Sequence, residues 1–146
     1  MDSSGTGFTQ EERAAMKERA AEAKASARRG SGAKRAEADE RDALAKIAEM
    51  APEDRVIAEA LHAIVQANAP DLAARTWYGM PAYARDGKVI VFFKPAAKFK
   101  VRYAEVGFNE WANLDDGDMW PTAFAVTTVN AEIEQALTDL IVKAVS

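Results

Sequence analysis

The segment WYGMPAYARDGKVIVFF, residues 77–93, decides the fold. Residues 89–93 are continuously apolar, which is typical of a strand buried on both faces or nearly so. Residues 85–88 precede them with the pair Asp-Gly, which favours the primed turn that matches the twist of two paired strands. The strand before that turn is rich in aromatic residues and is interrupted by Gly79 and Pro81. The segment therefore predicts an antiparallel hairpin with a central, buried strand.

Downstream of this hairpin, apolar and polar residues alternate with the period of two that is typical of strands. Apolar positions alternate with basic ones over residues 98–103, which predicts a strand with one apolar and one basic face (Phe99, Val101 and Tyr103 against Lys98, Lys100 and Arg102). After a polar connection, residues 124–127 predict a further strand. Asn130 is placed to cap a last helix over residues 131–145.

Upstream, the apolar positions recur at helical steps. They predict a short helix over residues 42–50 and a longer one over 53–68, with Pro52 in the first turn of the second helix. The order is helix, helix, strands in hairpin succession, helix. We therefore expect an α+β domain over residues 42–146, in which an antiparallel sheet of four to five strands is covered by terminal helices.

Residues 1–41 differ in composition from the rest and are expected to be accessory. Thr9 and Glu12 form a capping box at the start of an Ala-rich helix that runs from Gln10 to Arg29. This helix has no apolar stripe to bury, and glycine follows it at positions 30 and 32. We interpret residues 1–41 as an exposed helix followed by a flexible linker.

Composition excludes several classes of function. The chain has 146 residues, no cysteine and a net charge of −4, so it has no thiolate nucleophile, disulfide framework or cysteine-ligated metal. The acidic balance argues against bulk binding to nucleic acid or to an anionic membrane. No apolar run is long enough to span a bilayer, and the N-terminus lacks the features of a secretory signal. We expect a cytoplasmic protein.

The segment at residues 77–83, WYGMPAY, carries a resemblance to a known family. With its flanking segments it resembles the YdhG-like family of small bacterial proteins, a domain of unknown function, over about residues 42–145. The resemblance implies a compact frataxin-like α+β layer. It also implies an intracellular iron chaperone, with iron or an iron-using protein as the partner, because this role has been proposed for a member of the family.

Three carboxylates are the candidate metal ligands. Asp115, Asp116 and Asp118 lie within four positions of one another, and hard carboxylate oxygens suit iron, magnesium or calcium. The spacing matches no calcium motif. The alternative is a polar turn in which Lys98, Lys100 or Arg102 relieves the crowded charge.

An aromatic cleft is the candidate ligand site. Gly79 and Pro81 predict a bent strand, and we expect Tyr78, Met80 and Tyr83 to line a cleft with Phe93 or Tyr103 opposite. The alternative is an ordinary core with one kink at the edge of the sheet. A pocket and a filled core both accommodate these tyrosines.

No catalytic residue is assigned. His62 is the only histidine and is interpreted as structural, since no nucleophile elbow and no phosphate-binding loop is present. The favoured function is a non-enzymatic binding protein. The alternatives are a small-ligand-binding or enzymatic domain that uses residues 78–83, and a protein-interaction module.

Overall fold

The computed structural model describes residues 7–30 and 32–146, and in this part of the chain five helices accompany one five-stranded sheet. The strands are β1 (Ala73–Trp77), β2 (Met80–Arg85), β3 (Lys88–Lys94), β4 (Ala104–Phe108) and β5 (Ala123–Val126). The helices are α1 (Gln10–Arg29), α2 (Ala33–Ala48), α3 (Pro52–Asn68), α4 (Ala96–Phe99) and α5 (Ala131–Ala144). The expected α+β class is confirmed.

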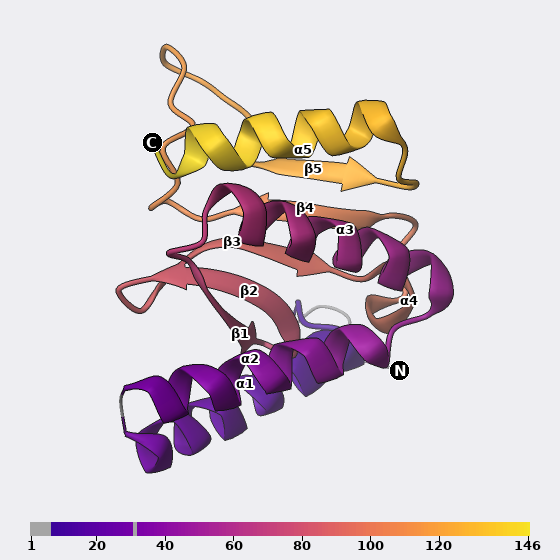
Figure 1. The fold of residues 1–146 in the computed structure, drawn as a ribbon. Coiled ribbons are helices and arrows are strands. Elements are labelled where there is room, and N and C mark those ends of the chain that lie inside the picture. The colour runs from indigo at the N-terminus through magenta and orange to yellow at the C-terminus, as the bar shows by residue number, and fades with distance from the viewer. Residues whose placement is uncertain (1–6, 31) are drawn as a thin grey trace.

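The sheet is an antiparallel meander in which the strands lie side by side in chain order, from β1 to β5 (Figure 1). The apolar strand β3 is central, as its composition predicted, and the turn at Asp86-Gly87 joins it to β2. Pro81 pairs with Thr76 of β1, whereas the pairing of β2 with β3 begins one residue later, at Ala82. The missing N–H of the proline therefore falls where no ladder to β3 exists.

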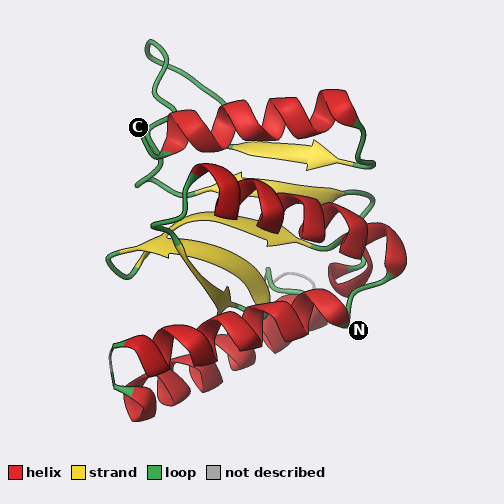
Figure 2. Cartoon of the chain, in the orientation of Figure 1, coloured by secondary structure: helices red, strands yellow, loops and turns green. Residues whose placement is uncertain are grey.

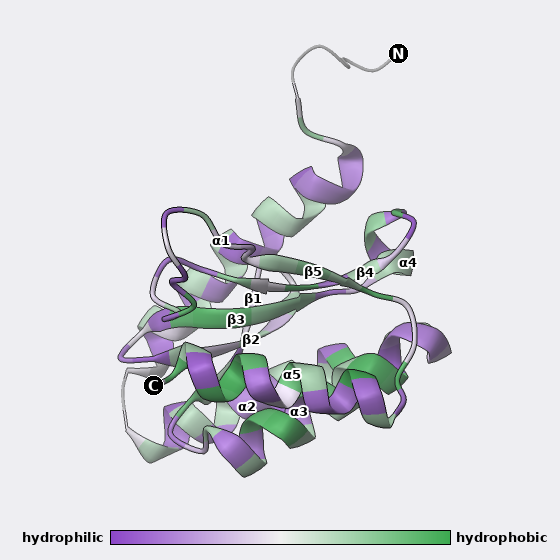
Figure 3. Ribbon diagram, turned by 90° about the horizontal axis from the view of Figure 1, so that it is seen from above, coloured by the Kyte–Doolittle hydropathy of each residue, from purple (hydrophilic) through white to green (hydrophobic). Residues whose placement is uncertain are grey.

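Helices α2, α3 and α5 cover one face of the sheet. α3 and α5 lie in front of it in Figure 2, and the view from above shows α2 on the same side (Figure 3). The main core lies between these helices and the sheet. Its larger buried side chains come from α2 (Ile47), α3 (Ile57, Leu61, Val65), the sheet (Tyr83, Val91, Phe93, Val106) and α5 (Leu137, Ile141). Among the described residues no helix has both the length and the apolar character needed to cross a membrane.

The strand expected over residues 98–103 is wrong. Pro95 ends β3 and caps the short helix α4, and Lys100 then takes a left-handed conformation with φ of 55°. This reversal breaks the period of two. Phe99 is buried, whereas Tyr103 stays exposed. The lysines of this stretch therefore do not form one basic sheet face.

The exposed helix and linker expected over residues 1–41 are also corrected. α1 has the predicted bounds and capping box, but α2 begins at Ala33, so the expected boundary at residue 42 falls inside a helix. Ala43 and Ile47 of α2 belong to the main core, and α1 lies beside α2 near the β1 edge (Figure 1). Residues 1–6 and 31 lie outside the described part. The independent folding of residues 42–146 stays a prediction.

The role of α2 in the core gives a first test. Changing Ile47 to Ala should lower the free energy of unfolding by about 2–5 kcal/mol, because Ile47 is 3% exposed and its loss leaves a cavity. Leu44 lies in the same helix but is 42% exposed, so Leu44→Ala should cost less than about 0.5 kcal/mol. Urea denaturation of both variants measures the difference, and equal effects would mean that α2 is not part of the core.

Candidate functional site

The turn between β1 and β2 has an unusual backbone. Trp77 pairs with Met80, so the loop consists of Tyr78 and Gly79 only. Both residues are left-handed, with φ of 54° at Tyr78 and 75° at Gly79. The predicted bent strand is thus a two-residue hairpin turn of the primed type. A tyrosine at positive φ is strained, and strained residues are concentrated at functional sites.

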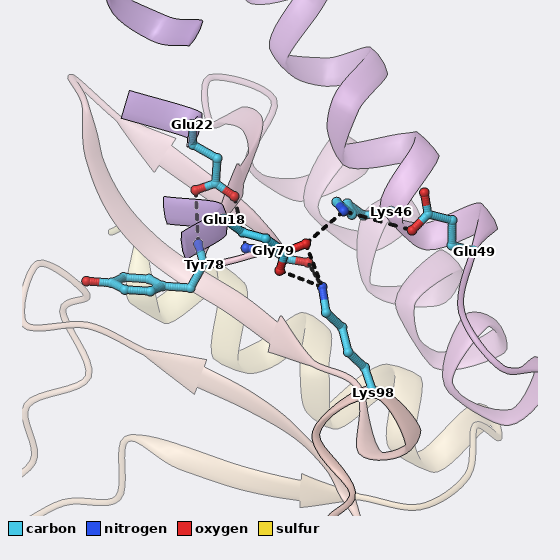
Figure 4. A network of polar contacts seen from close by, with 7 residues as sticks. All are labelled: Glu18, Glu22, Lys46, Glu49, Tyr78, Gly79 and Lys98. Carbon is cyan, nitrogen blue, oxygen red and sulfur yellow. Dashed lines mark hydrogen bonds and ion pairs between the residues drawn. The ribbon is translucent and has the colours of Figure 1, made fainter. Parts of the chain in front are cut away.

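A carboxylate from α1 lies on this turn. The N–H of Tyr78 donates to one oxygen of Glu22 at 3.0 Å, and the N–H of Gly79 donates to the other at 2.9 Å (Figure 4). Successive N–H groups of a left-handed turn form a concave site for anions. The two turn residues are separated from Glu22 by more than 50 positions, so this contact is tertiary.

A second α1 carboxylate lies between two lysines next to the turn. Lys98 donates to Glu18 at 3.0 Å and to the carbonyl of Gly79 at 3.0 Å, and Lys46 donates to Glu18 at 3.1 Å (Figure 4). Burial by itself raises the pKa of Glu18, but the hydrogen bonds from Lys98 and Lys46 outweigh it and hold the pKa below its usual value. Glu18 is therefore ionised at neutral pH. We call Glu18, Glu22, Lys46, Tyr78, Gly79 and Lys98 the Gly79 site.

A hollow of about 460 Å³ opens beside the Gly79 site. Glu18, Lys46 and Lys98 line it together with Met50 and Pro95, among others. On its wall, buried Asp54 accepts the N–H of Ala97 at 3.0 Å and so fixes the start of α4. The hollow therefore offers apolar surface next to two ammonium groups and the turn.

One face of α1 makes all these contacts. Glu11, Ala15, Glu18 and Glu22 follow one another at steps of four, three and four residues, so they lie on the same side of the helix. Glu11 pairs with Lys100 at 3.0 Å, and Ala15 is buried in a small cluster with Met80 and Phe99. The sequence interpretation missed this docking because it searched for an apolar stripe. The signal was an acidic stripe with one alanine.

The expected aromatic cleft is wrong as a single site. Tyr83 and Phe93 lie in the main core, whereas Met80 belongs to the small cluster beside α1, with Tyr78 packed against it. Side chains alternate along a strand, so Met80 and Tyr83, three positions apart, point to opposite faces of the sheet. Tyr103 is 39% exposed and joins neither group. Of the five expected residues, the Gly79 site contains Tyr78, and it does so through the backbone N–H.

The expected metal ligands do not converge. Asp115, Asp116 and Asp118 are exposed in the connection between β4 and β5, where Asp115 and Asp118 line an open hollow with Trp120. Within residues 7–30 and 32–146, no three histidine, aspartate or glutamate side chains are grouped so that they can hold a metal ion. Two of the lysines considered as charge partners for the aspartates, Lys98 and Lys100, pair with α1 glutamates instead.

His62 contacts a buried tyrosine. Its Nδ1 lies 3.0 Å from the hydroxyl of Tyr83, which is 1% exposed. Burial raises the pKa of Tyr83 well above its usual value, so the phenol stays protonated. Burial lowers the pKa of His62, and the nearby Glu40 carboxylate only partly opposes this. A hollow of about 320 Å³ lies over the pair, between α2 and α3.

The comparisons with known proteins assign no family. No protein-family model, no curated protein and no solved structure matches this chain. The candidate site therefore depends on its own geometry.

Two glycines allow a matched test of the Gly79 site. Gly79 and Gly87 occupy equivalent places in two-residue turns, with φ of 75° and 79°. Alanine is strained at both positions by about 1 kcal/mol. Of the two, only Gly79 has neighbours that an added Cβ would meet, namely Oε1 of Glu18 and Nζ of Lys98. We expect Gly79→Ala to cost about 1 kcal/mol more than Gly87→Ala, since these flexible side chains must give up hydrogen bonds.

Denaturation in the wild-type and Glu18→Ala backgrounds checks this expectation. The extra cost of Gly79→Ala should shrink when Glu18 is absent, because the displaced contact is then already missing. An equal cost for the two glycines in the wild-type background would show that α1 does not contact the turn in solution.

The pKa of His62 predicts a dependence of stability on pH. Since the folded state holds this pKa below the unfolded value of about 6.5, the stability contribution is complete above that value and falls as the pH decreases toward the folded pKa. We expect the free energy of unfolding to decrease from pH 7.5 to pH 5.5. In His62→Gln the free energy of unfolding should change less with pH over this range, because the chain has no other histidine. Parallel slopes would contradict the proposed burial of His62.

Proposed function

We propose that this protein is a small binding protein and that its Gly79 site holds a carboxylate of the ligand. The supporting observation is the position of Glu22, whose two oxygens accept the N–H groups of Tyr78 and Gly79 at 3.0 and 2.9 Å. A carboxylate of the chain itself thus occupies the anion-binding turn in the way that a ligand carboxylate would.

The two α1 carboxylates also indicate the ligand class. Glu22 marks an anion position on the turn, and Glu18 marks another between Lys98 and Lys46. A molecule with two carboxylates on a short aliphatic body has acceptors for both positions. Its carbon chain would contact the apolar part of the hollow at Met50 and Pro95. We therefore propose a dicarboxylate as the class of small ligand.

The Gly79 site suits an anion better than a metal ion. Its hydrogen-bond donors are the two turn N–H groups and the two lysine ammonium groups, and all of them donate to the carboxylates of Glu22 and Glu18. A ligand that replaces these carboxylates must itself supply anionic acceptors. The iron chaperone implied by the YdhG-like resemblance remains a separate hypothesis, to which the exposed aspartates of the β4–β5 connection add no preformed ligand set. The proposal includes no catalytic step.

A titration with glutarate tests the proposal. In full-chain Glu18→Ala/Glu22→Ala both anion positions have lost their internal carboxylates, so glutarate should shift the backbone amide resonances of Tyr78 and Gly79. Binding to the wild type should be at least about tenfold weaker, because Glu22 competes at the high effective concentration of a tethered group. Glu11→Ala, which removes an α1 carboxylate from Lys100, should behave like the wild type.

A further variant separates specific from diffuse binding. Adding Gly79→Ala to Glu18→Ala/Glu22→Ala should abolish the response, because the new Cβ would displace the ammonium group of Lys98 from the turn. Unchanged Tyr78 and Gly79 amides in Glu18→Ala/Glu22→Ala at millimolar glutarate would reject the proposed function.

A further inference from the structure

α1 is held mainly by its carboxylates. Among its described residues Ala15 alone is buried, although one guanidinium nitrogen of Arg19 is also shielded from solvent. Its polar docking contacts include those of Glu11, Glu18 and Glu22, and Ser26 accepts a hydrogen bond from Arg35 of α2. The side chains of Glu18 and Lys98 are 31% and 36% exposed. Partly exposed ion pairs contribute little each, so we expect the helix to undock at a lower cost than the elements of the main core.

The connection to α2 allows α1 to leave without disturbing the core. α1 ends at Arg29 and α2 begins at Ala33, with Gly30 and Gly32 as the flanking caps at φ of 74° and 95°. Glycine adopts other backbone conformations at little cost. The side chain that ties the reversal is Arg35 of α2, which donates to the hydroxyl of Ser26 and to the carbonyl of Gly30 and is not part of the main core. The core residues of α2, Ala43 and Ile47, lie at the far end of that helix.

The surface under α1 has a defined complement. It offers Lys100, then the Met80 and Phe99 patch, then Lys98 and Lys46, and finally the two turn N–H groups. The matching helix must carry acid, small residue, acid and acid on one face. The α1 segment of another copy of this chain has this pattern by definition.

We infer that α1 of a second copy can fill the Gly79 site, so that two chains exchange their first helices. This inference rests on the proposed function, since the transferred helix binds through the same carboxylate positions. Reciprocal exchange fills both sites and gives a closed dimer in which each copy contributes Glu18 and Glu22 to its partner's site. Docking within one chain competes through its high effective concentration, so exchange needs concentrated protein or a weakened internal contact.

Two full-chain variants test the exchange. Glu18→Ala/Glu22→Ala has an intact docking surface but no carboxylates to fill it. Gly79→Ala/Lys98→Ala has an intact α1 but a damaged surface. Each alone should sediment as a monomer, and an equimolar mixture at tens of micromolar should form a one-to-one complex. As a matched control, Lys88→Ala/Lys143→Ala keeps its own α1 and its own docking surface, so its α1 should stay docked within its own chain. Its mixture with Glu18→Ala/Glu22→Ala should therefore show several-fold less complex.

A peptide of residues 8–30 provides a measurement that does not depend on the second variant folding. Labelled with a fluorophore, it should bind full-chain Glu18→Ala/Glu22→Ala at least tenfold more tightly than wild type. The same peptide carrying Glu18→Ala and Glu22→Ala should not bind. Absence of peptide binding, together with monomers in the mixture, would overturn the exchange.

These results remain separable from the glutarate titration. Amide shifts with glutarate but no trans binding of α1 would retain the carboxylate site and reject the exchange. Trans binding without glutarate binding would reject the small dicarboxylate and retain the helix as the partner.

Discussion

The contact between Glu22 and the β1–β2 turn governs how the N-terminal helix is placed. Tyr78 and Gly79 are both left-handed, so their N–H groups project together from the hairpin, and α1 covers them. Covered N–H groups need acceptors, and the two oxygens of one carboxylate supply both. With Glu22 on the turn, Glu18, one helical turn earlier in α1, lies next to Lys98 and Lys46. The remaining α1 contacts follow from the same face of the helix.

Two kinds of force therefore hold two parts of the molecule. Burial of apolar side chains between the sheet and α2, α3 and α5 stabilises the main core, where Leu61, Phe93 and Ile141 are essentially inaccessible to solvent. α1 is held by charge-assisted hydrogen bonds and one small cluster around Ala15. Salt and competing anions weaken the second kind of force far more than the first. The Gly79 site thus lies in the part of the fold that is held mainly by polar contacts.

Local geometry does not make the Gly79 turn special. The turn at Asp86-Gly87 has nearly the same φ values, yet no neighbour lies within 4 Å of where a Gly87 Cβ would be. The difference comes from what faces each turn. At Gly79 the lysines of α2 and α4 and the acids of α1 meet, and the adjoining hollow adds apolar surface. This convergence of three helices on one strained turn is the observation behind the binding role that we propose.

The sequence alone determined the hairpin at Asp86-Gly87, the central strand β3, the helices α3 and α5, and the capping box of α1. Each depends on neighbours a few positions apart, through turn chemistry, capping or periodicity. Only tertiary structure decided the left-handed conformation of Lys100, the continuation of helix α2 across residue 42, and the Gly79 site. Alternation over 98–103 was real in composition, but Pro95 and the docking of Phe99 beside Met80 overrode it. Glu18 meets Lys98 across 80 positions. Such pairing leaves no periodic trace, because a charge needs only one partner in space, whereas a buried stripe needs many residues in register.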